Sequence, residues 1–103
     1  MGRLLAIDYG ARRIGLALSD PLKMIASPYR TIIKKNNTNL IEEIERIIAE
    51  EDVELTIIGL PLGMAGQITE QTKKVEEFAD KLIARGIAIE YEDERWSTLA
   101  AKR

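Results

Sequence analysis

Residues 4–20 read LLAIDYGARRIGLALSD, two short apolar stretches on either side of a turn. The apolar stretches predict β-strands over residues 4–9 and 13–18, and Gly10 in the turn between them favours a hairpin. Asp8 interrupts the first of these strands. Because ionised carboxylates are rarely buried unless a hydrogen bond, an opposite charge or a metal satisfies them, an acid at the end of a core strand predicts a site for a cation or a phosphate.

The composition is typical of one globular domain. With 103 residues, of which 46% are hydrophobic and 31% charged, the chain is long enough to form a single core. No apolar run reaches the roughly 18 residues that span a bilayer, and the apolar stretch after Met1 is too short for a signal peptide. The chain contains no Cys and no His. We therefore expect a cytoplasmic protein without a membrane segment, whose catalysis rests on carboxylates, Lys, Tyr or hydroxyl groups.

The charge balance limits the kind of nucleic-acid surface that the chain can have. A net charge of −2 at pH 7 argues against a broadly basic surface. Local phosphate contacts are still available from three basic pairs, Arg12-Arg13, Lys34-Lys35 and Lys73-Lys74. Taken alone, each pair is more simply explained as part of a solvated surface.

The rest of the chain predicts an α/β fold. An extended segment over residues 24–34 follows the hairpin, and helices and strands then alternate at residues 40–51 (helix), 53–60 (strand), 69–85 (helix), 87–91 (strand) and 96–102 (start of a helix). We expect Gly86 to be the C-cap of the helix that precedes it. This order predicts a mixed five-stranded sheet of three antiparallel strands followed by two parallel ones, with the first strand in the middle beside the fourth.

Acids also follow the last predicted strand, where residues 92–95 read EDER. The end of that strand can share an edge of the sheet with Asp8 and with the glycine-rich loop at residues 59–66, which is where open α/β sheets bind ligands. Carboxylates that converge from separate strands make an oxygen-lined site that suits Mg²⁺ or Mn²⁺. Such a site can bind a phosphodiester and hydrolyse it without His.

Three ordered motifs resemble the YqgF or RuvX family, bacterial relatives of Holliday-junction resolvases with an RNase H-like fold. The motifs are residues 7–20 (IDYGARRIGLALSD), 59–66 (GLPLGMAG) and 93–98 (DERWST), and together they span nearly the whole chain. The resemblance implies a metal-dependent endonuclease of structured nucleic acid that uses Mg²⁺ or Mn²⁺. The implied substrate is the precursor of 16S rRNA in ribosome biogenesis or, as an alternative, a Holliday junction.

The resemblance also implies roles for individual residues. Asp8 and Glu94 are the implied metal ligands and catalytic acids, with Asp93 as a neighbour or substitute of Glu94. The Arg12-Arg13 pair is implied to contact backbone phosphates, and Arg95 either steadies the acids or reaches the substrate.

The family domain continues into a further helix that carries a third catalytic acid, whereas this chain ends at Arg103. We therefore expect residues 1–103 to form a single RNase H-like domain that is incomplete at its C-terminus, with its last helix truncated. Without that helix, the surface around Trp96 and Leu99 stays exposed. The exposed surface predicts self-association, for example as a homodimer.

Other interpretations stay open on the sequence alone. The chain can be a catalytically inert module that binds nucleic acid or an assembly factor, because the third acid is missing. It can also be a nucleotide-binding domain, since the related actin and sugar-kinase fold opens with a similar Asp-x-Gly strand and hairpin. Asp8 itself can be a strand-end acid that accepts hydrogen bonds from backbone N–H groups of the following turn. An acidic run such as residues 92–94 is often a solvated loop.

Overall fold

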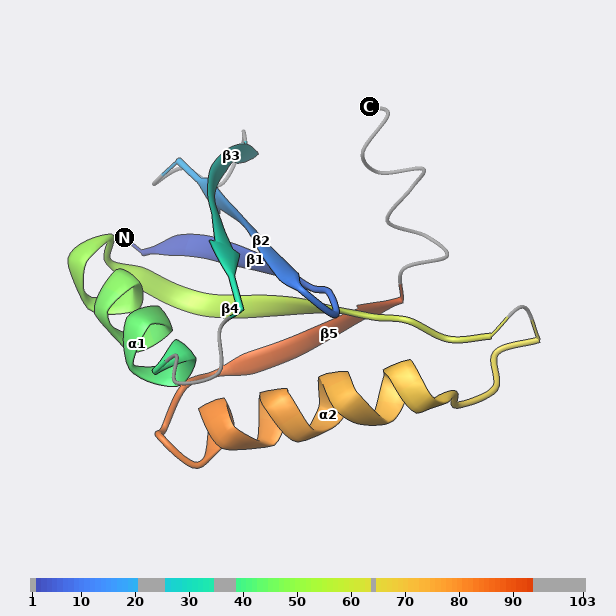
Figure 1. Ribbon diagram of the computed structural model, residues 1–103. Helices are drawn as coiled ribbons and strands as arrows, with labels where there is room; N and C mark the ends of the chain where they lie inside the picture. Colours follow the sequence, from blue (N-terminus) through green and yellow to red (C-terminus); the bar gives the residue numbers. More distant parts are fainter. Residues whose placement is uncertain (1, 21–25, 35–38, 64, 94–103) are drawn as a thin grey trace.

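The predicted order of strands and helices is confirmed. The computed structural model describes residues 2–20, 26–34, 39–63 and 65–93 (Figure 1). Its elements are β1 (Arg3–Tyr9), β2 (Arg13–Ser19), β3 (Ala26–Ile33), α1 (Leu40–Glu50), β4 (Val53–Leu60), α2 (Glu70–Ile83) and β5 (Ile89–Asp93). The last strand begins and ends two residues later than the sequence predicts. The helix predicted at residues 96–102 lies outside the described residues.

The five strands form one mixed sheet in the order β3-β2-β1-β4-β5. Strand β2 runs antiparallel to both β1 and β3, whereas β4 runs parallel to both β1 and β5. The predicted fold class, with three antiparallel strands followed by two parallel ones, is therefore confirmed. Strand β1 lies in the middle of the sheet, so its carboxyl end is flanked by the turn into β2 and by the end of β4.

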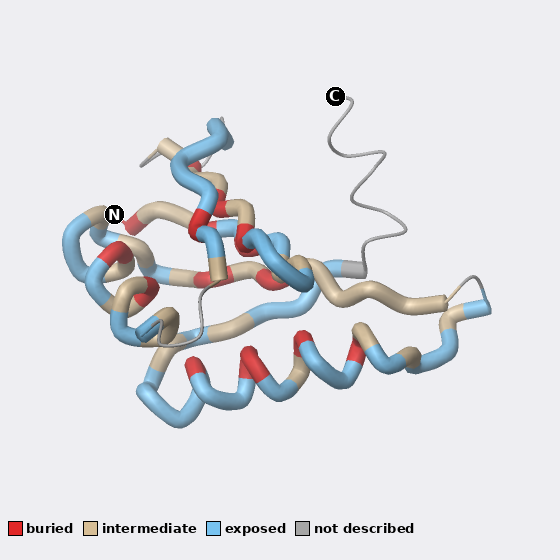
Figure 2. The backbone as a smooth tube through the Cα atoms, viewed as in Figure 1, coloured by how far each residue is buried: buried red, intermediate tan, exposed pale blue. Residues whose placement is uncertain are grey.

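Both helices pack on the same face of the sheet. Alternate residues of β1 point to this face, where Leu5 and Ile7 are almost completely buried, while Ala6 and Asp8, which alternate with them, are exposed. The buried stretches of α1 and α2 face the sheet (Figure 2). The core of the domain consists of Leu5, Ile7, Ile14, Leu16, Ile32, Ile44, Ile47, Ile58, Val75, Phe78, Ala79 and Leu82. None of the helices in the described ranges is long and apolar enough to cross a membrane.

Helix α2 is fastened to the end of β4 at its first turn. The Thr69 hydroxyl accepts a hydrogen bond from the Thr72 backbone N–H, and the Thr72 hydroxyl accepts one from the Thr69 N–H, which together form a capping box. The fully buried Thr72 hydroxyl also donates to the Pro61 carbonyl. At the other end, the C-cap is Ala84 rather than the predicted Gly86. Gly86 instead adopts the left-handed conformation, with a φ of 82°, that turns the chain back toward β5.

Candidate metal and nucleic-acid site

Asp8 lies on the face of the sheet opposite the helices, at the last position but one of β1. Its side chain is exposed, and it makes no hydrogen bond or ion pair with the described residues. The backbone N–H of Gly10, in the turn that follows, donates instead to the Arg13 carbonyl at 3.0 Å. These observations count against a strand-end acid satisfied by its own turn, and they leave the Asp8 carboxylate available to a ligand.

A glycine keeps the space beside Asp8 open. Asp8 pairs with Gly15 across the hairpin. A Cβ added to Gly15 would lie 3.8 Å from the Asp8 Cβ, in ordinary van der Waals contact. Glycine inside a strand often marks a place where a ligand or another backbone approaches closely. At position 15 a larger side chain would occupy the volume next to the carboxylate.

The carboxyl ends of β1, β4 and β5 lie side by side at this edge. Ile7 pairs with Ile58 in the parallel β1–β4 ladder, and one residue further along, Gly59 pairs with Glu92 of β5. Register partners share a face of the sheet, so Glu92 lies on the same face as Asp8, with Gly59 between them. Two strand spacings place the Cα atoms of Asp8 and Glu92 about 10 Å apart. Their side chains are long enough to approach one ion from opposite sides.

Glu92 is a further acid of this site that the sequence alone does not single out, because it belongs to an acidic run of the kind that often forms a solvated loop. The structure places it inside β5, exposed and without an ion pair to the described residues. The alternation of Ile89 and Tyr91 with Glu90 and Glu92 is the sequence signal that identifies it. Extending the strand by that alternation would have placed Glu92 on the Asp8 face.

The remaining predicted acids lie at or beyond the end of β5. Asp93 is the last residue of that strand and pairs with Leu60. Glu94 and Arg95 lie outside the described residues, so the roles assigned to them stay predictions. Within the described ranges, no group of three or more acids is gathered closely enough to hold a metal ion.

The donor chemistry of this edge nevertheless fits Mg²⁺ or Mn²⁺. Asp8 and Glu92 offer carboxylate oxygens, which hard divalent cations prefer. Mg²⁺ in particular is usually held by one or two carboxylates, with water and substrate phosphates completing its octahedron. The open volume beside Gly15 gives those further ligands room.

The turn between β1 and β2 presents the predicted arginine pair. Arg12 and Arg13 are both exposed, and neither forms an ion pair with the described residues. The turn itself is well defined, because a Cβ on Gly10 would lie 2.5 Å from the Arg13 carbonyl oxygen, which only glycine avoids. The Lys34 N–H donates to the Arg12 carbonyl at 2.8 Å and ties the turn to β3. Both guanidinium groups are therefore left without an ion-pair partner among the described residues.

Tyr9 fixes the backbone next to Asp8 from the helix face. Its ring stacks on Phe78 of α2, with centroids 4.4 Å apart. Its carbonyl accepts a hydrogen bond of 3.2 Å from the Gln71 side chain, and its hydroxyl accepts one of 2.9 Å from Lys34. The main chain at Asp8 is thus held by contacts from α2 and from the residue that follows β3.

This arrangement of strands and acids defines the class of fold as RNase H-like. RuvC of T. thermophilus, solved in complex with a Holliday junction substrate, superposes with a TM-score of 0.56 over 90% of this chain and 65% of that chain, at 14% identity. YeaZ from Pseudomonas aeruginosa gives a TM-score of 0.50 over 90% of this chain and 43% of that chain, at 16% identity. At these identities the likeness concerns the fold.

Sequence comparison narrows the class to a family. The model of the RuvX family, described as "Holliday junction resolvase", matches residues 2–103. A relative from Roseiflexus sp. (strain RS-1), named "Putative pre-16S rRNA nuclease", is 43% identical over 99% of this chain and 73% of its own length. A relative of the same name from Koribacter versatilis (strain Ellin345) is 36% identical over 99% of this chain and 67% of its own length. The chain belongs to the RuvX family, and the resemblance seen in its motifs is confirmed.

Proposed function

We propose that this chain hydrolyses phosphodiester bonds in structured nucleic acid with the help of Mg²⁺ or Mn²⁺, and that its substrate is precursor 16S rRNA. The observation that carries the proposal is the unpartnered Asp8 carboxylate, which lies beside Gly15 and shares its sheet face with Glu92. Membership of the RuvX family supports the nuclease chemistry, and the names of the two bacterial relatives support the rRNA substrate. The family description makes the Holliday junction the second substrate to test.

The acids at this edge would hold the metal. Asp8 and Glu92 are the described candidates, and the motif carried by the family adds Asp93 and Glu94. When bound, a divalent ion would supply positive charge that stabilises the developing charge on the phosphate oxygens. The Arg12-Arg13 pair would hold the phosphates on either side of the scissile bond, since guanidinium groups bind phosphate oxygens through paired hydrogen bonds.

A catalytically inert binding module is the second candidate function. It is favoured by the lack of a three-acid cluster among the described residues, because a two-carboxylate site holds a metal ion more weakly. On this alternative, Asp8 would contribute nothing beyond a surface charge.

The deciding experiment is cleavage of an end-labelled structured RNA and of a four-way DNA junction, each with Mg²⁺ or Mn²⁺. We expect Asp8→Asn to reduce cleavage on the order of 100-fold or more, because losing a ligand costs at least as much as losing its supporting contacts. Asp80→Asn is the matched control, since Asp80 is an exposed acid of α2 and its substitution removes the same charge. Chelation with EDTA should abolish cutting. Equal cutting by both variants, or no cutting by the folded chain, would favour the inert module.

Two further proposals accompany this function. A cytoplasmic location follows from a substrate made during ribosome assembly. Self-association as a homodimer is proposed from the sequence around Trp96 and Leu99, which lies outside the described residues. Sedimentation at increasing protein concentration tests it, and a mass that stays monomeric at every concentration would contradict it.

A further inference from the structure

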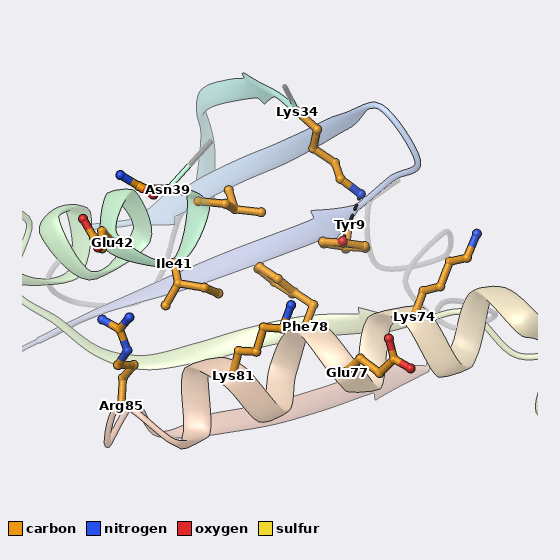
Figure 3. A pocket seen from close by; sticks show the side chains of 11 residues that line it. Tyr9, Lys34, Asn39, Ile41, Glu42, Lys74, Glu77, Phe78, Lys81 and Arg85 are labelled. Carbon is orange, nitrogen blue, oxygen red and sulfur yellow. Dashed lines mark hydrogen bonds between the residues drawn. The ribbon is translucent and has the colours of Figure 1, made fainter. Parts of the chain in front are cut away.

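A pocket lined by cationic side chains lies on the helix side of the sheet. A pocket of about 390 Å³ opens between α1, α2 and the end of β1, and the stacked rings of Tyr9 and Phe78 lie at one side of it (Figure 3). Its wall carries four cationic side chains, contributed by Lys34, Lys74, Lys81 and Arg85. This pocket lies on the face of the sheet opposite Asp8, because Tyr9, which lines it, and Asp8 occupy successive positions of β1 and so point to opposite faces.

The charge in this pocket is only partly balanced. Two acids, Glu42 and Glu77, line the same wall. Arg85 is occupied by an ion pair with Glu45, which does not line the pocket. Lys74 and Lys81 form no ion pair with any described residue. The first turn of α1 also faces the pocket, and its N-cap Asn39 makes no side-chain hydrogen bond to the turn, so the partial positive charge of the helix end adds to that of the lysines.

Two of the lysines lie on one face of α2. Lys74 and Lys81 are seven residues apart on α2, which corresponds to about 10 Å along the helix axis. That distance is close to the rise of about three nucleotides along one strand of a DNA duplex. The Lys34 ammonium adds a third cation beside Tyr9, where it donates to the Tyr9 hydroxyl and to the Gly10 carbonyl and keeps one N–H group for another acceptor.

We propose that this pocket binds phosphate groups, and that the phosphates belong to the backbone of a nucleic-acid strand. Two lysines that lack an ion pair to any described residue and are spaced along α2 fit a repeating polyanion better than a single compact ion. The inference rests on the proposed function, since it assigns a second contact surface to the same substrate. This second surface lies on the helix face of the sheet, so the substrate passes over the carboxyl edge of β1, from the Asp8 face to α2.

The test measures binding separately from cleavage. Labelled structured RNA is titrated with Asp8→Asn protein in EDTA, and fluorescence anisotropy is recorded at several salt concentrations. The double variant Lys74→Ala/Lys81→Ala is compared with Arg30→Ala/Arg46→Ala. The control pair removes two exposed positive charges from β3 and α1, outside the pocket. Circular dichroism and thermal unfolding verify that each variant folds, and Lys74→Arg/Lys81→Arg keeps the charge while changing the side chain.

We expect the pocket pair to weaken RNA binding on the order of 10-fold at low salt, and to reduce the slope of log affinity against log salt by about 1.4 to 1.8. The control pair should change affinity less than about 3-fold, and the arginine pair should bind nearly as well as the parent. Equal losses for the pocket and control pairs would overturn the proposal. A second result would also overturn it: pyrophosphate or a nucleoside monophosphate stabilises the parent, the pocket pair abolishes that stabilisation, and RNA affinity stays unchanged. The site would then take a small phosphate. Pocket-dependent binding without any Asp8-dependent cleavage would leave this inference standing and refute the proposed nuclease.

Discussion

The Nζ atom of Lys34 donates a hydrogen bond of 2.9 Å to the Tyr9 hydroxyl and lies 4.2 Å from the centre of the Tyr9 ring. This contact joins the chain just after β3 to the end of β1, and Phe78 stacks on the same ring, with the ring centroids 4.4 Å apart. The main chain of Tyr9 is held separately by Gln71. Asp8 is thus attached to a backbone that other elements keep in place, which is the condition a metal ligand requires.

Gln71→Ala should therefore weaken the site without unfolding the domain. It removes the hydrogen bond to the Tyr9 carbonyl, which costs about 1 kcal/mol of the free energy of unfolding. We expect affinity for Mn²⁺, measured by titration calorimetry, and cleavage to fall together by about 10-fold. Glu70→Ala, an exposed neighbour in the same turn, is the control. Unchanged Mn²⁺ affinity in Gln71→Ala would show that the contact does not position Asp8.

Substitutions at Gly15 separate folding from access to Asp8. Gly15→Ala meets only an ordinary contact at 3.8 Å, and the lost flexibility of glycine should raise stability by about 0.5–1 kcal/mol. Gly15→Val places two further methyl groups beside the carboxylate, so we expect the domain to fold but to lose most metal-dependent cleavage. Thermal unfolding and the cleavage assay measure the two effects. A Val variant that folds and cuts at the parental rate would show that this space is not used.

The sequence predicts the elements well because each has a local pattern. Ile7 and Asp8 alternate as a half-buried strand requires, and the apolar positions of α2 recur at helical spacing. The lack of a hydrogen-bond partner for the Asp8 carboxylate among the described residues is not predictable in this way. It depends on the Gly10 N–H, which donates instead to the Arg13 carbonyl across the turn. The lysine-lined pocket is likewise formed by segments that are distant in sequence, so no local pattern indicates it.

Thr56→Val should stabilise the domain. Thr56 is 1% exposed in β4, and its hydroxyl finds no hydrogen-bond partner within the described residues. Valine has nearly the same shape and removes the unsatisfied polar group, so the free energy of unfolding should rise by about 1 kcal/mol. Urea unfolding measures it, with Thr72→Val as a contrast, since that change breaks the bond to Pro61 and should destabilise. A loss of stability in Thr56→Val would mean that the hydroxyl is satisfied in solution.

Tyr91 makes stability sensitive to alkaline pH. It pairs with Ile58, and its pKa lies above the ordinary value of 10.0 because burial disfavours the phenolate, with Asp80 and Glu76 of α2 adding repulsion. The folded state then keeps its proton at a pH where the unfolded chain has lost it. This contribution is fully present below pH 10.0 and is lost as the pH rises through the raised pKa of the folded state.

Tyr91→Phe removes that titration, so its stability should decline less steeply above about pH 10 than that of the parent. Urea unfolding between about pH 8 and pH 11 measures the difference. Tyr29→Phe is a useful comparison, because the pKa of Tyr29 is also raised, through burial and its hydrogen bond to Glu51, although it lies at the opposite edge of the sheet. Each variant should remove part of the pH dependence, and the two effects should add, since the residues share no partner. If Tyr91→Phe follows the parental curve at every pH, the pKa of the Tyr91 phenol is not raised in the folded state by burial or by Asp80 and Glu76.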